Sequence, residues 1–369
     1  MSEERFILDV IEEASAKRRA DRRRFMRMAA GAGAVGGLAM LGACNNDDEV
    51  IVIPTPTPTP SPTGSVTDAD VLNFALQLEY LEAQFYSYAA FGTGLSSSLL
   101  GGTGTQGSVA INTSATNGAG QPRQVQFQDP IVAQYAREIA YDEIAHVTFL
   151  RNALGSAAVA QPAINLSGDA NGAFTAAARA AGVIGANATF DPYSSDEFFL
   201  LGAYLFEDVG VTAYMGGVAL LSNKTFIEAA AGIHAAEAYH AGLVRTTLYR
   251  KGVTTASLIT AAGQISDARD SLDGSTDLDQ GIVATVNGQQ VANIVPADSN
   301  AIAFARTPGQ VLNIVYLNRA SVTGGGFFPG GETLAVMRGD DAAKALDELR
   351  ATGFWDEASL RARPLLHVL

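Results

Sequence analysis

The sequence reads Glu-Ile-Ala-His at residues 143–146 and Glu-Ala-Tyr-His at residues 237–240. In each segment a glutamate precedes a histidine by three positions, and residues three apart lie on one face of a helix. Each segment can therefore offer a carboxylate oxygen and an imidazole nitrogen to the same metal ion. One such segment occurs by chance in many helices, so its meaning depends on the sequence around it.

Four segments carry apolar residues at intervals of three and four, which predicts four amphipathic helices. They are expected at about 67–90, 130–154, 195–221 and 224–251. Thr67 and Asp129 are good caps for a first turn, Pro130 suits the first helical position, and Gly252 is a good stop. The sequence therefore predicts an all-α core, a four-helix bundle at residues 67–252.

Six polar residues fall in the middle of these apolar stripes: Glu79, Glu143, His146, Glu207, Glu237 and His240. A carboxylate that leaves water without a partner is strongly disfavoured, or it becomes protonated. Two divalent cations would balance the four glutamates, and two neutral imidazoles would complete the ligands. The pattern predicts a dinuclear site, and it does not choose between two iron and two manganese ions.

The two halves of the expected bundle repeat each other. A tyrosine follows a glutamate by seven positions in both halves, and an arginine follows a histidine by five; the pairs are Glu79 with Tyr86, Glu207 with Tyr214, His146 with Arg151 and His240 with Arg245. This repetition indicates an approximate two-fold relation between the halves. Tyr86 and Tyr214 are predicted to donate hydrogen bonds to the carboxylates, with core packing or a redox role as alternatives.

Three more residues lie close to the motifs in sequence. Glu82 is either a further metal ligand or a solvated residue at the edge of its stripe. His234 precedes Glu237 by three positions, and we expect it near the site as a hydrogen-bonded residue and not as a ligand. Asp142 and Asp208 each neighbour an expected ligand but point about 100° away on a helix. We therefore expect them at the surface or behind the ligands.

The motifs resemble the ferritin-like superfamily, most closely the branch of ferritin-like domain or desiccation-related proteins. The resemblance rests on residues 76–86, 206–214 and 237–242, and it extends into 265–274 and 306–312. It implies redox chemistry on dioxygen or peroxide at a dinuclear iron or manganese centre, of the ferroxidase, peroxidase or catalase type. The alternative is a non-enzymatic stress protein of the cell envelope with a structural or vestigial metal site.

Residues 1–43 are predicted to be a signal peptide for export. Arg22 and Arg23 begin a twin-arginine pattern, and a short apolar stretch at 28–41 follows that is too short to span a bilayer as an ordinary helix. The following Leu-Gly-Ala-Cys resembles a bacterial lipobox, in which Cys44 would carry the lipid. The alternative is a basic, alanine-rich helix with an incidental cysteine. Export would place the protein in the periplasm or cell envelope, attached to a membrane by its lipid.

Residues 44–66 are predicted to form a semi-rigid linker, because proline recurs at every second position from 54 to 62. The formal charge of the chain is −14, and residues 44–369 carry all of the excess. So acidic a body is a poor binder of nucleic acid. Residues 253–369 are expected to form a mixed, partly irregular extension. It would pack on the bundle or form an interface between subunits of a homo-oligomer.

Overall fold

The computed structural model describes residues 66–112 and 124–331. Four long helices form the centre of this part of the chain: α2 (Asp68–Phe91), α3 (Pro130–Leu154), α5 (Asp196–Val218) and α6 (Lys224–Gly252). The predicted all-α core is therefore confirmed. The expected signal peptide, Cys44, nearly all of the proline-rich linker and a helix expected at about 340–351 lie outside the described residues.

Each of the four helices begins at a side chain that accepts a hydrogen bond from a free backbone N–H of the first turn. Thr67 and Asp70 form a reciprocal capping box at the start of α2. Asp129, Ser195 and Asn223 accept the equivalent bonds at the starts of α3, α5 and α6. These caps satisfy N–H groups that a helix leaves unpaired, so local sequence fixes where each helix starts.

Two helix ends differ from the sequence prediction. The third helix ends at Val218 and not at 221, because the chain closes there into a turn in which the N–H of Leu221 donates to Val218 O at 3.2 Å. Gly252 was expected to stop the fourth helix but is its last residue. A side chain at Gly252 would have its Cβ 2.5 Å from Ile259 Cγ1, so glycine is needed there for close packing of the next helix.

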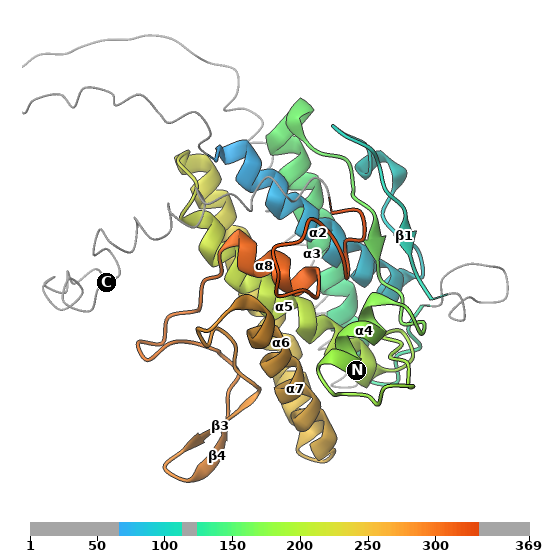
Figure 1. The fold of residues 1–369 in the computed structure, drawn as a ribbon, viewed down its shortest axis with the longest axis vertical. Helices are drawn as coiled ribbons and strands as arrows, with labels where there is room; N and C mark the ends of the chain where they lie inside the picture. The colour runs from blue at the N-terminus through green and yellow to red at the C-terminus, as the bar shows by residue number, and fades with distance from the viewer. Residues whose placement is uncertain (1–65, 113–123, 332–369) are drawn as a thin grey trace, which may run out of the picture. The chain divides into compact units, whose positions relative to one another are not determined.

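The four helices pair along their lengths (Figure 1). Helix α2 packs along α3, α5 packs along α6, and contacts of α2 with α5 and of α3 with α6 complete the bundle. Helix α5 alone among the described helices is long and apolar enough to cross a membrane by length and composition. However, 89% of its most apolar window is buried inside the fold. It is the central helix of the bundle, with apolar side chains on all sides.

The two long connections of the bundle pack against each other. The first contains the short 3-10 helix η1 (Ser97–Leu99) and strand β1 (Val109–Ala110); the second contains η2 (Gly155–Ala157), strand β2 (Ile164–Asn165) and helix α4 (Ala173–Ala180). Strands β1 and β2 pair in parallel. Gly107 allows this approach, because a Cβ there would lie 2.0 Å from the backbone nitrogen of Ala163.

The part of the extension that the structure describes packs on α5 and α6. It consists of α7 (Ala256–Asp273), a hairpin of β3 (Val283–Val286) and β4 (Gln289–Ala292), and α8 (Pro308–Val315). The sequence predicts a short helix at about 311–317, and helix α8 starts three residues before it, capped by Thr307. It also ends earlier than expected, because Leu317 has a left-handed φ of 52°. Beyond α8, Phe327 and Phe328 are buried in the core.

A network of buried ion pairs attaches the extension to the bundle. Its arginines are Arg245, Arg269 and Arg306, each at most 1% exposed, and its aspartates are Asp208, Asp273 and Asp279. Arg269 joins two of these aspartates, at 2.8 Å from Asp208 Oδ2 and 2.6 Å from Asp279 Oδ1. Its guanidinium also lies 4.5 Å from the ring centroid of Tyr204. The network therefore connects α5, α6, α7 and the segments that follow.

We expect Arg269→Met to lower the free energy of unfolding by about 3 kcal/mol, because it leaves buried carboxylates without one of their cationic partners. Arg250→Met is the matched control. Arg250 is 54% exposed and pairs with Asp129 at 2.9 Å, and loss of such a surface pair costs about 0–1 kcal/mol. Urea unfolding of both variants would test this. Equal effects of the two substitutions would show that the network contributes no more than a surface pair.

Candidate metal centre

The structure brings the six predicted ligand residues together at the centre of the bundle. Each of the four long helices contributes a glutamate that is at most 1% exposed, and α3 and α6 add histidines that are 9% and 3% exposed. Their ligand atoms form two groups in which all atoms lie within 4.8 Å of one another. The first group is Glu79, Glu143, His146 and Glu237, and the second is Glu143, Glu207 and His240.

In the first group the carboxylates surround the Nδ1 atom of His146. This atom lies 3.2 Å from Glu79 Oε2, 3.5 Å from Glu237 Oε1 and 3.6 Å from Glu143 Oε2. In the second group, Nδ1 of His240 lies 3.1 Å from Glu143 Oε1 and 3.7 Å from Glu207 Oε2. Glu143 therefore faces both histidines, one with each of its oxygens. The histidine rings themselves lie 6.1 Å apart between centroids.

Two tyrosines cross between the halves of the bundle. The hydroxyl of Tyr86 on α2 donates to Glu207 Oε1 on α5, and the hydroxyl of Tyr214 on α5 donates to Glu79 Oε1 on α2. Each bond occupies one carboxylate oxygen and leaves the other directed toward the centre. The two bonds are related by the approximate two-fold relation that the sequence indicates. They fix the orientation of both glutamates without using the oxygens that face the histidines.

Atoms without hydrogen-bond partners are concentrated at this centre. In the described part of the chain, fifteen buried side-chain nitrogen and oxygen atoms lack such a partner, and eight of them belong to the six residues. Glu79 and Glu207 contribute one free oxygen each, Glu143 and Glu237 contribute two each, and each histidine contributes Nδ1. Buried polar atoms are normally paired, so this cluster calls for a partner of opposite charge.

The free atoms fit a pair of divalent cations. Carboxylate oxygens with imidazole nitrogens suit iron and manganese. The eight free donor atoms are six carboxylate oxygens and two imidazole nitrogens. Glu143 belongs to both ligand groups, whereas Glu79 and Glu237 belong to the first group only and Glu207 to the second only. The number and identity of the ions stay predictions.

Burial and mutual repulsion shift the pKa values of the glutamates. Burial and repulsion from Glu237 and Glu79 raise the pKa of Glu143 to about 7. Burial also raises the pKa of Glu207 well above its ordinary value. For Glu79, burial alone would raise the pKa, but His146 and the hydrogen bonds around the carboxylate leave it below the ordinary value. Without cations, the centre therefore retains protons to reduce its negative charge.

For the two histidines burial acts in the opposite direction, but the neighbouring carboxylates still raise the pKa of both rings. Burial alone would lower the pKa of His146, but the charges of Glu79 and Glu143 raise it well above the ordinary value. For His240, burial is likewise outweighed by Glu207 and by contacts with Asp142 and Glu143. Protons and metal ions thus compete for the same nitrogen atoms, and binding of a cation requires that these protons leave.

Glu82 lies next to the centre but outside both ligand groups. Glu82 is 6% exposed, and the pKa of its carboxyl is raised well above the ordinary value by burial and then by Glu237 and the other three glutamates. The two-fold relation places Gly210 of α5 opposite Glu82 of α2. A Cβ at Gly210 would lie 2.4 Å from Glu237 Oε2 and 3.3 Å from Glu82 Oε1. Glycine at this position makes room for both carboxylates.

Two neighbours of the motifs have defined roles. His234 lies outside both ligand groups, and its Nδ1 lies 3.1 Å from the backbone oxygen of Val211. Asp142 is buried, and its Oδ2 lies 3.3 Å from Nε2 of His240 on α6. This contact orients the ring of His240 so that Nδ1 faces the carboxylates. Only the packing of α3 on α6 reveals that contact.

The structure gives Asp208 and Gly210 roles beside the centre that the sequence reasoning did not specify. Asp208 was expected either at the surface or behind the ligands; it is buried, directly after Glu207, and it pairs with Arg245 and Arg269. A signal for Gly210 was present, because it follows Glu207 by three positions as Glu82 follows Glu79. A signal for Asp208 was weaker: it consisted of arginines within apolar helical segments, which need buried partners.

Comparison with known proteins agrees with this architecture. A family model described as Ferritin-like domain matches residues 67–250, the segment that contains all four long helices.

The chain belongs to the ferritin-like superfamily.

Two relatives of this ferritin-like chain place it in the branch of the desiccation-related proteins. A ferritin-like catalase from Nesocodon mauritianus is 26% identical over 284 residues, which are 73% of this chain and 85% of the relative. A desiccation-related protein from Craterostigma plantagineum is 27% identical over 260 residues, which are 67% of this chain and 76% of the relative. No solved structure matches the chain.

We expect Glu143→Ala to remove bound metal almost completely, because this glutamate belongs to both ligand groups. We expect His240→Ala to remove mainly one of two ions, because His240 belongs to one group only. Metal content of the purified ferritin-like chain, measured by mass spectrometry, tests both.

Two variants serve as controls: Glu228→Ala on the exposed surface of α6 and His234→Ala next to the centre. Both should retain full metal content. Full metal content in Glu143→Ala and His240→Ala as well would show that the ligand assignment is wrong.

Proposed function

We propose that this ferritin-like protein uses two iron or two manganese ions for redox chemistry on peroxide or dioxygen, with hydrogen peroxide disproportionation as the main reaction. The observation that carries the proposal is the cluster of eight free donor atoms, shared among two histidines and four glutamates. The relative named a ferritin-like catalase supports peroxide as the substrate. Disproportionation converts two molecules of hydrogen peroxide into two of water and one of dioxygen.

Two adjacent ions of this kind, when bound, can take up two electrons from one peroxide and return them to another. The protein's own part is to hold the centre rigid and nearly free of water. Tyr86 and Tyr214 fix the carboxylates of Glu207 and Glu79. Asp142 fixes the ring of His240. A preorganised arrangement of this kind lowers the reorganisation that a charge-changing reaction requires.

Oxidation of one peroxide to dioxygen releases two protons, and groups beside the centre must hold them until they are given to the other peroxide to form water. Glu82 is suited to this task, because burial and four neighbouring glutamates raise the pKa of its carboxyl and so favour the protonated acid. His146 is the more exposed of the two histidine ligands, with 11% of its side chain accessible. We therefore propose that peroxide and water reach and leave the centre next to His146.

A second function is a non-enzymatic stress protein in which the centre is structural or vestigial. The observation that favours it is the relative named a desiccation-related protein, which is as similar to this chain as the catalase is. In that case metal ions would stabilise the bundle by cancelling the charge of the buried glutamates. Peroxide turnover distinguishes the two functions, whereas metal content alone does not.

The chain, purified without chelator, is expected to contain about two iron or manganese ions and to release dioxygen from hydrogen peroxide. An oxygen electrode measures the reaction directly, and Glu143→Ala should lose the activity together with the metal. Glu228→Ala controls for the loss of a carboxylate elsewhere. About two bound ions with no reaction with peroxide or dioxygen would exclude the enzyme and favour the stress protein.

We also propose that the protein is exported by the twin-arginine route and held on a membrane through lipid on Cys44. The order of Arg22, Arg23, an apolar stretch and the lipobox-like Leu-Gly-Ala-Cys supports this. Expressed in a Gram-negative bacterium, Arg22→Lys/Arg23→Lys should keep the protein in the cytoplasm. Cys44→Ala should instead give exported protein that no longer sediments with membranes. Membrane association that survives Cys44→Ala would contradict the lipid anchor.

A further inference from the structure

Two apolar pockets lie next to each other on the side of the bundle that the extension covers. The outer pocket lies among α4, α5, α7 and α8, and the inner pocket lies between α2, α5 and α8. Two side chains line both pockets: Leu205 of α5 and Ile314 of α8. The pockets are therefore neighbours with these two side chains at their common boundary, and the movement of an aliphatic side chain between rotamers is fast on the timescale of catalysis.

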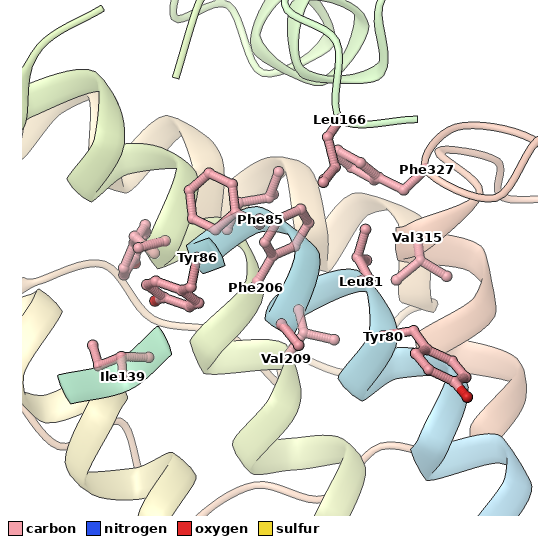
Figure 2. Close-up of a cluster of buried hydrophobic side chains, with 14 of the residues drawn as sticks. Tyr80, Leu81, Phe85, Tyr86, Ile139, Leu166, Phe206, Val209, Val315 and Phe327 are labelled. Carbon is pink, nitrogen blue, oxygen red and sulfur yellow. The ribbon is translucent and has the colours of Figure 1, made fainter. Parts of the chain in front are cut away.

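The inner pocket ends at the metal centre. Glu79, Glu82, Gly210 and Tyr214 belong to its lining, and the rest of the lining is aliphatic or aromatic. Figure 2 shows part of that wall: side chains from α2, α5, α8 and the following loop converge on one space. Those that both line the pocket and carry labels are Leu81, Phe206, Val209, Val315 and Phe327. The extension thus supplies one wall of a space whose opposite wall contains a predicted metal ligand.

The outer pocket reaches the surface. Ala180 and Ser271 on its rim are exposed, whereas Phe174, Leu201 and Ile265 deeper inside are buried. Its lining has one charged residue, Arg269, whose side chain is 1% exposed and already bound to Asp208 and Asp279. No charged group is therefore available in the outer pocket to bind an ion or a charged substrate.

We propose that these two pockets form a passage for dioxygen between the surface and the metal centre. A small apolar molecule loses nothing when it leaves water for an apolar lining, whereas a charged or strongly polar molecule loses its hydration. Leu205 and Ile314 form the boundary between the two pockets, and Glu79, Glu82 and Gly210 line the inner pocket at the metal centre. The identity of the gas rests on the proposed function, in which dioxygen is the product of peroxide disproportionation or the oxidant.

The proposed passage would give dioxygen a path separate from that of the polar reactants. Hydrogen peroxide and water are polar and exchange on the side of His146, where the centre has its partly accessible ligand. Dioxygen is apolar and would leave or enter on the opposite face, where α8 and Phe327 cover α2 and α5. The extension is then part of the reactant path and not only a cover for the bundle.

Dioxygen itself is the probe, because it is paramagnetic and speeds the relaxation of nearby nuclei. We would record methyl NMR spectra of the full chain under dioxygen pressure, with diamagnetic Zn²⁺ present, so that no turnover is needed. The methyl groups of Leu205, Val209 and Ile314 should relax faster than those of Val132 and Leu248. The latter two are fully buried but line neither pocket.

Ile314→Phe should narrow the passage. It is expected to remove the dioxygen effect at Val209 in the inner pocket and to preserve it at Leu201 in the outer one. Ile314→Ala should increase the effect at Val209. Leu312→Phe is the matched control: Leu312 is fully buried on the same helix and lines neither pocket, so it carries a similar overpacking cost without entering the passage.

An effect confined to the outer pocket, or no larger at Val209 than at Val132, would overturn the proposal. So would an Ile314→Phe variant that loses the effect at Val209 but exchanges dioxygen during turnover at the unaltered rate. Failure of the proposed function has a different signature. The metal-loaded protein would then not react with peroxide or dioxygen, while the relaxation pattern measured with Zn²⁺ would remain.

Discussion

Four glutamates share a space from which water is excluded, and their mutual repulsion is the constraint on which the rest of this fold depends. Each carboxylate comes from a different helix, so the repulsion acts directly against closure of the bundle. Protonation and raised histidine pKa values reduce it in part. Two divalent cations would convert the same charges into the strongest cross-link between the four helices, because every helix would then bind to one shared pair of ions.

The surroundings of the centre limit how the bundle can relieve that repulsion. Tyrosines that cross between the two halves hold Glu79 and Glu207 in place. On the outer side of α5 and α6, three buried arginines oppose three aspartates, one of which, Asp208, directly follows Glu207. This network attaches the extension to the bundle. Its arginines pair with the three aspartates and not with the glutamates of the centre. The bundle therefore keeps its acidic core in a fixed geometry.

Sequence periodicity was sufficient for the helices and for the group of residues at the centre, because a helix repeat fixes which side chains share a face. The structure places Glu79, Glu143, His146, Glu207, Glu237 and His240 in one location, as that periodicity indicates. The periodicity does not show which residues of different helices contact each other. The contact of Asp142 with His240, the arginine network and the pocket wall from α8 depend on packing between distant segments, which one sequence without a structure does not encode visibly. Glu82 remained open for the same reason.

The pairing of Glu82 with Gly210 has a consequence for the origin of this protein. The two helical hairpins, α2 with α3 and α5 with α6, have the relation expected of a duplicated ancestor that once assembled from two identical copies. At this pair the two halves differ: one carries a carboxylate, and the other has no side chain. A symmetric pair of α2–α3 hairpins would place two carboxylates at this position, and a symmetric pair of α5–α6 hairpins would place none. The two halves are therefore not interchangeable, and the metal centre has a carboxyl group beside it on one side that a symmetric pair of hairpins could not supply on one side alone.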